Sequence, residues 1–242
     1  MSHDNSRTEY LLGRDGTARL AAAKVCVFGV GGVGGYVCEA LARAGVGHIT
    51  LVDGDDVSPS NVNRQIIATS ETVGRTKVDV MRERILSVNP DCKVTALRLF
   101  YLPENADVID FSDFDYVADA VDTVSAKIEI VCRADAAGVP VISSMGAGNK
   151  LYPERFRISD IYSTSVCPLA RVMRRELKAR GIRKLPIVWS DEQPRPYAEE
   201  PEPEYLEDGK RGRTPPGSIS FVPSAAGLIM AGKIVRDLAG VE

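Results

Sequence analysis

The stretch KVCVFGVGGVGGYV (residues 24–37) decides the fold of this chain. It begins with a short apolar run that contains β-branched residues, continues through glycines and ends in a helical pattern. Gly29, Gly31 and Gly34 have the spacing GxGxxG, and Gly32 lies between the last two. Glycines at such a turn let backbone N–H groups approach a phosphate at the N-terminus of the following helix. We therefore expect a nucleotide-binding strand–loop–helix unit at this position.

Strands and helices alternate through the first 150 residues. Apolar runs with β-branched residues are followed by stretches whose apolar residues recur at helical spacing. This alternation predicts a Rossmann-like α/β fold, with a mostly parallel sheet and helices on both faces. We expect strands at 24–29, 48–53, 93–100, 115–122 and 139–144, and helices at 33–44, 77–88 and 125–137.

The last third of the chain follows a different pattern. We expect strands at 150–161, 185–190 and 218–221, and helices at 168–180 and 223–238. Residues 191–216 are rich in proline and charge and almost without apolar residues, which predicts a long mobile loop. The whole chain, 1–242, would be a single domain with a nucleotide-binding core, 1–150, and a C-terminal extension, 151–242.

Composition excludes several classes of protein. Apolar residues make up 44% and charged residues 26% of the chain, which is typical of a globular protein. The sequence has no run of about 18 apolar residues that would predict a membrane helix, so we expect no membrane partner. The N-terminus resembles neither a signal peptide nor a transit peptide. The five cysteines never have CxxC spacing, which argues against a disulfide framework or a four-thiolate zinc site and favours a cytoplasmic location.

The net charge of −3 is an average over two opposing regions. Taken whole, it argues against a nucleic-acid partner, because such proteins usually carry a basic excess. Residues 190–210, however, carry eight acidic and two basic side chains, so that the remainder of the chain has a net charge of +3. Residues 171–184 alone carry seven basic side chains and one acidic one. The total charge therefore leaves RNA binding open.

Polar residues after the expected strands suggest what kind of nucleotide binds. Asp53 closes the second strand, where a carboxylate would accept hydrogen bonds from ribose hydroxyls. A dinucleotide-dependent dehydrogenase is one interpretation. Arg64 and Lys77, however, are the kinds of cation that neutralise adjacent phosphates, which favours a triphosphate. Asp122 ends the fourth expected strand at the edge where such sheets bind ligands, and it could hold Mg²⁺. An ordinary surface lysine and a strand-end aspartate are the structural alternatives for Lys77 and Asp122.

These residues together resemble a known family. GxGGxG, Asp53, SNVNRQ (residues 60–65), Lys77 and Asp122 are similar to the adenylation domain of the ubiquitin-activating-enzyme-like superfamily, which includes thiamine- and molybdopterin-pathway adenylyltransferases. The resemblance implies ATP and Mg²⁺ as cofactors, attack of a carboxylate on the α-phosphate, and release of pyrophosphate. It also implies a homodimer in which an N-terminal arginine, here Arg7, reaches the ATP of the partner subunit. The implied nucleotide-binding residues are Gly29, Gly31, Gly32, Gly34, Asp53, Asp55, Asn61, Arg64, Gln65 and Lys77, with Asp122 on the metal.

Longer stretches resemble one branch of that superfamily, the tRNA threonylcarbamoyladenosine dehydratases. The matching stretches are residues 11–20, 27–47, 62–69, 73–85, 167–182 and 215–227. The implied reaction adenylates the threonine carboxylate of the modified adenosine, which then cyclises with release of AMP and pyrophosphate. The catalytic residues that the resemblance implies are Arg64, Lys77, Asp122 and Arg7. The alternative is an adenylyltransferase that activates the C-terminal glycine of a small sulfur-carrier or ubiquitin-like protein, although many of those enzymes carry two CxxC pairs.

The implied tRNA substrate gives the basic segment a function. Arg171, Arg174, Arg175 and Lys178 would contact tRNA phosphates, with further cations at 210–213; a merely solvated helix face is the alternative. A sulfur-relay protein is a further partner that the resemblance allows. Cys167 begins the basic helix, where it is either a nucleophile or a packed thiol, and intramolecular cyclisation favours the packed thiol.

Overall fold

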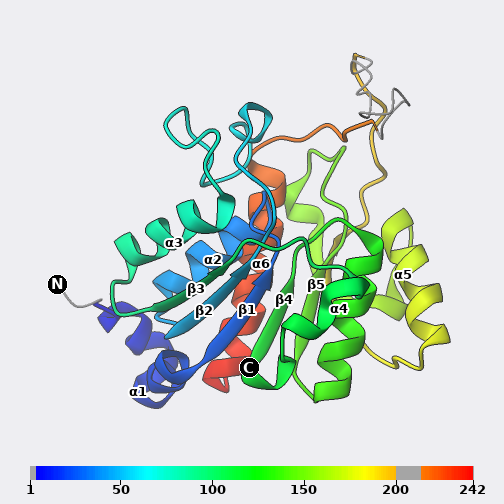
Figure 1. The fold of residues 1–242 in the computed structure, drawn as a ribbon. Helices are drawn as coiled ribbons and strands as arrows, with labels where there is room; N and C mark the ends of the chain where they lie inside the picture. Colours follow the sequence, from blue (N-terminus) through cyan, green and yellow to red (C-terminus); the bar gives the residue numbers. More distant parts are fainter. Residues whose placement is uncertain (1–3, 200–213, 242) are drawn as a thin grey trace.

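A seven-stranded sheet organises the described part of the chain (Figure 1). The structure is a computed structural model that describes residues 4–199 and 214–241. The strands are β1 (Lys24–Phe28), β2 (His48–Val52), β3 (Lys93–Leu97), β4 (Tyr116–Asp119), β5 (Val141–Ser144), β6 (Phe156–Asp160) and β7 (Pro186–Ser190). The helices are α1 (Ser6–Ala22), α2 (Gly34–Arg43), α3 (Lys77–Val88), α4 (Val124–Ala137), α5 (Pro168–Ala179) and α6 (Phe221–Ala239).

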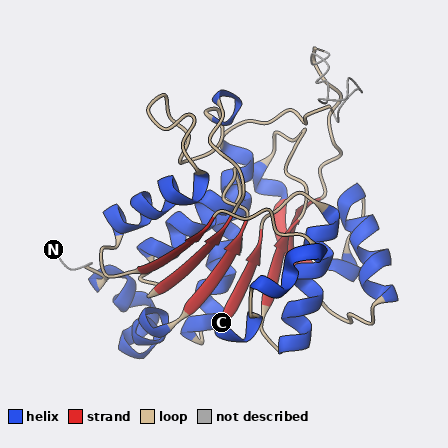
Figure 2. Ribbon diagram, in the orientation of Figure 1, coloured by secondary structure: helices blue, strands red, loops and turns tan. Residues whose placement is uncertain are grey.

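Helices cover both faces of this sheet (Figure 2). Successive side chains of a strand point to opposite faces, so one strand supplies two cores. In β1, Val25 and Val27 pack with α2, α3 and α6 in one core, whereas Cys26 and Phe28 pack with α4 and the segment before β4 in another. A third core joins α4 and α5 to β7. The expected Rossmann-like α/β fold with helices on both faces is confirmed.

The strand order places the glycine loop at a switch point. The order is β3-β2-β1-β4-β5-β7-β6, with every neighbouring pair parallel except β7 and β6. The chain therefore runs outward from β1 through β2 and β3, and then returns to the other side of β1 as β4. Open α/β sheets bind ligands in the crevice outside the carboxyl ends of the strands at such a point.

Several elements differ from the sequence-based expectations. The strands expected at 93–100, 115–122 and 150–161 are shorter, as β3 (Lys93–Leu97), β4 (Tyr116–Asp119) and β6 (Phe156–Asp160). Helix α1 was not expected because it is mostly polar, buries only Gly16 and Leu20, and is interrupted at Gly13 by a positive φ of 71°. The strand expected at 218–221 is wrong, because α6 already begins at Phe221. The preceding residues find hydrogen bonds outside the sheet: Asn63 donates through Nδ2 to the Ser218 carbonyl at 3.0 Å.

The expected loop at 191–216 is described only at its two ends. The Arg195 N–H donates to the Asn149 carbonyl at 2.8 Å, and the Tyr197 hydroxyl donates to the Pro215 carbonyl at 3.3 Å. Residues 200–213, which include the basic residues at 210–213, lie outside the described residues. Among the helices that the structure describes, none is long and apolar enough to cross a membrane.

Candidate nucleotide-binding site

The loop between β1 and α2 has a path that only glycine can follow at two positions. Gly29 has a φ of 85°, and a Cβ placed on it would lie 2.8 Å from the Ala120 carbonyl oxygen. A Cβ on Gly34 would collide with the Gly29 carbonyl oxygen. The loop therefore lies against the residues that follow β4, with its backbone at the crevice between β1 and β4.

Asp53 fastens this loop to the end of β2. Its Oδ2 accepts a hydrogen bond from the Val30 N–H at 2.7 Å, and its Oδ1 accepts one from the Asp55 N–H at 2.9 Å. Burial raises the pKa of this carboxyl above its ordinary value, although the Lys77 ammonium and the two N–H groups oppose the rise. Each carboxylate oxygen keeps a second lone pair, which leaves capacity to accept from ribose hydroxyls.

Lys77 is a buried cation at the start of α3. Its side chain is 7% exposed, and its Nζ lies 2.6 Å from Oδ2 of Asp55, whose own side chain is 51% exposed. The Lys77 N–H also donates to the Asp55 carbonyl at 3.1 Å. A lysine whose ammonium is held by a carboxylate has few conformations to lose on binding a ligand, which suits a phosphate.

The segment SNVNRQ brings two further polar side chains to the glycines. Arg64 lies over Gly32: its Cγ is 3.5 Å from the position that a Cβ there would take. Its Nη1 donates to the Ser60 carbonyl at 2.7 Å. Gln65 lies against Gly31, and its Nε2 is 3.7 Å from the corresponding Cβ position.

The Gln65 amide carries the clearest sign of a ligand. The residue is only 7% exposed, and within the described residues its Oε1 has no hydrogen-bond partner. Buried polar atoms are almost always hydrogen-bonded, so an orphaned one requires an explanation. The oxygen and nitrogen of an amide can exchange places by a flip, so this group could present a donor to a phosphate oxygen. The donor set around the loop therefore fits a bound nucleotide.

Asn61 has a local structural role. Its Oδ1 accepts a hydrogen bond from the Ser58 N–H at 3.2 Å, which closes the short helical turn Pro59–Asn61. This turn shapes the segment that carries Arg64 and Gln65.

The turn between β4 and α4 places two aspartates in opposite environments. Asp122 lies three residues beyond the end of β4, is exposed, and makes no hydrogen bond or ion pair within the described residues. Asp119, the last residue of β4, is fully buried and lies 2.9 Å from Nζ of Lys127, which is also fully buried. The exposed carboxylate is the one available to a metal, whereas the buried one is already paired.

Phe100 is a residue of this region that could not be selected from the sequence. Its ring packs directly against Gly54, which is flanked by Asp53 and Asp55, while 62% of its surface remains exposed. The residue was expected to end a strand, but β3 stops at Leu97. An exposed ring beside the ribose-binding candidates offers a flat surface for a base.

Arg7 does not join these residues in its own subunit. It is an exposed residue of α1, and the neighbouring Asn5 contacts Gly45 in the turn before β2. This turn lies at the amino ends of the strands, whereas the glycine loop lies at their carboxyl ends (Figure 1). Arg7 therefore cannot be assigned to the site of its own chain.

The basic residues of α5 divide into two pairs. Arg171 and Lys178 are exposed, and their side chains form no hydrogen bond or ion pair with the described residues. Arg174 donates to the Thr164 carbonyl at 3.1 Å, and Arg175 forms an ion pair with Glu176 at 2.8 Å. Helix α5 lies beside α4 and away from α2 and α3 (Figure 1), so this surface is separate from the glycine loop.

The cysteines are packed residues. All five are unbonded, and Cys26 and Cys38 belong to the cores, where burial raises the pKa of both thiols. Cys167 is buried in the core formed by α4, α5 and β7. This environment is consistent with the packed-thiol interpretation.

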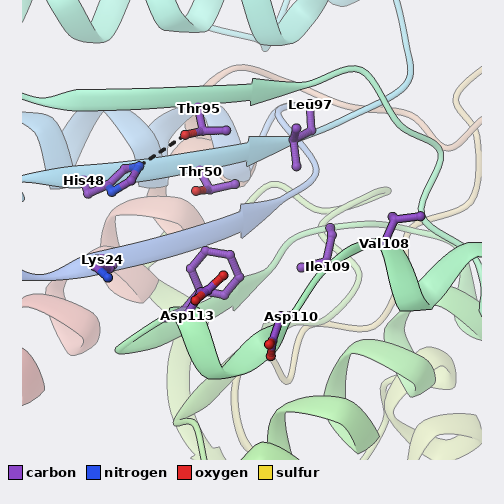
Figure 3. Close-up of a pocket in the computed structure, with 10 residues that line it drawn as sticks. Lys24, His48, Thr50, Thr95, Leu97, Val108, Ile109, Asp110 and Asp113 are labelled. Carbon is purple, nitrogen blue, oxygen red and sulfur yellow. Dashed lines mark hydrogen bonds between the residues drawn. The ribbon is translucent and has the colours of Figure 1, made fainter.

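A separate cavity of about 340 Å³ lies over the sheet at β1, β2 and β3 (Figure 3). Lys24 and His48, the first residues of β1 and β2, line it, and the His48 ring lies 3.2 Å from the Thr95 hydroxyl. Burial and two nearby lysines lower the pKa of His48. None of the expected site residues lines this cavity.

Known proteins are similar to this chain over nearly all of its length. The "tRNA threonylcarbamoyladenosine dehydratase" of Bacillus subtilis is 46% identical over 242 residues, covering 98% of this chain and 95% of that protein. The crystal structure of the Escherichia coli tRNA N6-threonylcarbamoyladenosine dehydratase in complex with ATP matches with a TM-score of 0.85 and 32% identity, covering 97% of this chain and 93% of that one.

A shorter similarity extends to the alternative considered above. The "Adenylyltransferase and sulfurtransferase uba4" of Aspergillus niger is 38% identical over 133 residues, which cover 55% of this chain and 27% of that protein. The family model described as "ThiF family" matches residues 4–242. This chain therefore belongs to the ThiF family.

Proposed function

We propose that this protein is an ATP-dependent tRNA threonylcarbamoyladenosine dehydratase. The observation that carries the proposal is the polar lining of the glycine loop in a chain that is similar to a dehydratase of that name over 98% of its length. Asp53, Arg64 and Gln65 surround the loop, and Lys77 lies beside Asp55. The relative of known structure binds ATP with the same fold.

Acidic side chains would bind the ribose of ATP, whereas cations and an amide would bind its phosphates. Asp53, with Asp55 beside it, would accept hydrogen bonds from the ribose, and Phe100 would offer its exposed ring to the adenine. Arg64, Gln65 and Lys77 would bind the phosphates over the glycine N–H groups, because adjacent phosphate charges require cations and donors. Asn61 would act by shaping the segment that carries Arg64 and Gln65.

Asp122 is the residue that would hold Mg²⁺. Mg²⁺ is usually bound by one or two carboxylates together with phosphates and waters. Asp122 is an exposed carboxylate three residues beyond the end of β4, which fits this pattern. When bound, Mg²⁺ would neutralise charge on the phosphates.

The reaction proceeds in two steps on this scaffold. A carboxylate oxygen of the threonyl group attacks the α-phosphorus of ATP, and pyrophosphate leaves. A neighbouring group of the threonylcarbamoyl side chain then attacks the activated carbonyl carbon, and AMP leaves with the former carboxylate oxygen. The net change in the nucleoside is the loss of one water. Positioning and charge neutralisation suffice for both steps, because the second attack is intramolecular.

Further parts of the proposal concern partners. The exposed Arg171 and Lys178 would contact tRNA phosphates, with Arg174 and Arg175 beside them on the same helix. We also propose a homodimer, in which Arg7 contacts the ATP of the partner subunit, since the turn that Asn5 contacts and the glycine loop lie at opposite ends of the strands. A cytoplasmic location follows from the tRNA substrate, and a sulfur-relay protein remains a candidate partner.

One experiment tests the reaction. The protein is incubated with ATP, Mg²⁺ and tRNA that carries threonylcarbamoyladenosine, and the tRNA is then digested to nucleosides for mass spectrometry. We expect a nucleoside lighter by one water, together with stoichiometric AMP. An unchanged nucleoside would refute the proposal, and pyrophosphate exchange that responds only to a glycine-tailed carrier protein would favour the adenylyltransferase alternative.

A further inference from the structure

A buried ion pair lies directly beneath the turn that carries Asp122. Asp119 and Lys127 are both 0% exposed, and their charged atoms are 2.9 Å apart. The Ser143 hydroxyl donates to the same Asp119 oxygen at 2.6 Å. In the sequence, Asp119 is only a strand-end residue, and no function was expected of Lys127. A lysine on the buried face of α4 interrupts the apolar pattern of that helix, which is the one signal that could have revealed it.

The pair holds both backbone polar groups of Val121. The Val121 N–H donates to Oδ1 of Asp119 at 3.3 Å, and Nζ of Lys127 donates to the Val121 carbonyl at 3.1 Å. That carbonyl belongs to the peptide unit that joins Val121 to Asp122. The hydrogen bond from Lys127 therefore fixes the orientation of this peptide plane, and with it the direction in which the chain continues to Asp122.

The preceding residue is fastened to the glycine loop. The Ala120 N–H donates to the Phe28 carbonyl at 2.8 Å, and the Ala120 carbonyl oxygen lies 2.8 Å from the position that a Cβ on Gly29 would take. The turn is thus held on one side by β1 and the loop, and on the other by the ion pair. The Asp122 side chain, which follows Val121 in this turn, makes no hydrogen bond or ion pair with the described residues.

Fold stability alone does not account for this pair. Removing two charges from water is costly, and well-packed apolar residues often stabilise a core equally well or better. Apolar residues, however, could not form the hydrogen bonds that Asp119 and Lys127 make with the N–H and carbonyl groups of Val121. We infer that Asp119 and Lys127 are positioning residues that orient Asp122 towards the metal-bound phosphates of ATP.

This inference rests on the proposed function and is tested through metal-dependent nucleotide binding. ATP affinity is measured by titration calorimetry without tRNA, over a range of Mg²⁺ concentrations, for the wild type and for the double variant D119V/K127M. The double variant removes both charges together, so it avoids an unpaired buried charge. Thermal unfolding is recorded for each protein. We expect the double variant to retain its melting temperature and its Mg²⁺-free ATP affinity, and to bind Mg²⁺ in the ATP complex about 10–100-fold more weakly.

A thermodynamic cycle shows whether the pair acts through Asp122. Asp122→Asn should weaken Mg²⁺ binding by itself. Adding it to D119V/K127M should cause no further loss, because the double variant has already displaced the Asp122 carboxylate. Arg84→Met serves as the control, since it breaks a different half-buried ion pair, with Glu39, that does not contact the turn. Its Mg²⁺ dependence should equal that of the wild type.

The outcomes separate the two proposals. A D119V/K127M protein that is folded and keeps wild-type Mg²⁺ dependence overturns the positioning role, as do fully additive losses in the cycle. If the double variant fails to fold, D119N/K127M, which also removes both charges and keeps the shape of the Asp119 side chain, takes its place with the same criteria. A wild-type protein whose ATP affinity does not respond to Mg²⁺ would instead refute the metal site of the proposed function, and the inference with it.

Discussion

Gln65 allows a prediction in which stability and function change in opposite directions. Its side-chain amide is buried, and Oε1 has no partner within the described residues. We consider the replacement Gln65→Met, which keeps the length of the side chain and removes both polar atoms. Without ligand, the protein should become more stable, because an unsatisfied buried polar atom costs about 1–3 kcal/mol. We expect the lower end, about 1 kcal/mol, since Oε1 is the one amide atom that is both buried and without a partner in the described residues.

The same replacement should weaken ATP binding. A hydrogen bond to a charged group contributes about 1.5–3 kcal/mol, which corresponds to a loss of about 10- to 150-fold in affinity. Urea denaturation without nucleotide measures the first effect, and ATP titration measures the second. Gln193→Met is the matched control, because Gln193 is exposed and should change neither quantity measurably. A less stable Gln65→Met protein with unchanged ATP affinity would show that the amide is structural and would refute the reasoning.

Three further predictions follow from other parts of the molecule. Gly34→Ala should abolish ATP binding and lower the melting temperature, because its Cβ would collide with the Gly29 carbonyl; calorimetry showing normal binding would contradict the loop geometry. Reversing both Arg171 and Lys178 to Glu should weaken tRNA binding and reduce the slope of its salt dependence by about 0.7–0.9 for each phosphate that is no longer neutralised, and an unchanged slope would exclude this face. Burial tends to raise the pKa of Glu39, but hydrogen bonds from two arginines outweigh it and lower that pKa. Glu39→Gln should therefore reduce the free energy of unfolding at neutral pH, and the difference from the wild type should shrink as the pH falls below the ordinary glutamate value; a difference that grows in acid would be contrary to this assignment.

Local pattern was sufficient for most of the fold. The glycine loop, the alternation of strands and helices, and the ends of α3 could be predicted because periodicity and turn chemistry are properties of neighbouring residues. Helix α1 was missed because its polar sequence buries only two residues. The segment before α6 was misassigned because its alternation suits a strand, whereas its hydrogen bonds are made with side chains far away in the sequence.

The candidate site shows the same division. The sequence was sufficient to select several site residues, because it gives both the residue type and the position after an expected strand. These residues are Asp53, Arg64, Gln65, Lys77 and Asp122. The sequence pointed to Asp122, but it could not show that Asp119, in the same apolar run, is already paired. Their difference depends on burial and on Lys127, eight residues farther on, and therefore on how α4 packs against the sheet. Phe100 acquires its place beside Asp53 only because the chain turns after β3 and returns to Gly54.

The sequence by itself therefore determined the strand–loop–helix unit, the family resemblance and the set of charged residues at the carboxyl ends of the strands. Tertiary structure alone decided which of those residues face the loop, which are already paired, and that Arg7 lies at the opposite edge. The physical reason is that secondary structure arises from interactions within a few residues, whereas burial, desolvation and ion pairing depend on segments that meet only when the chain is packed.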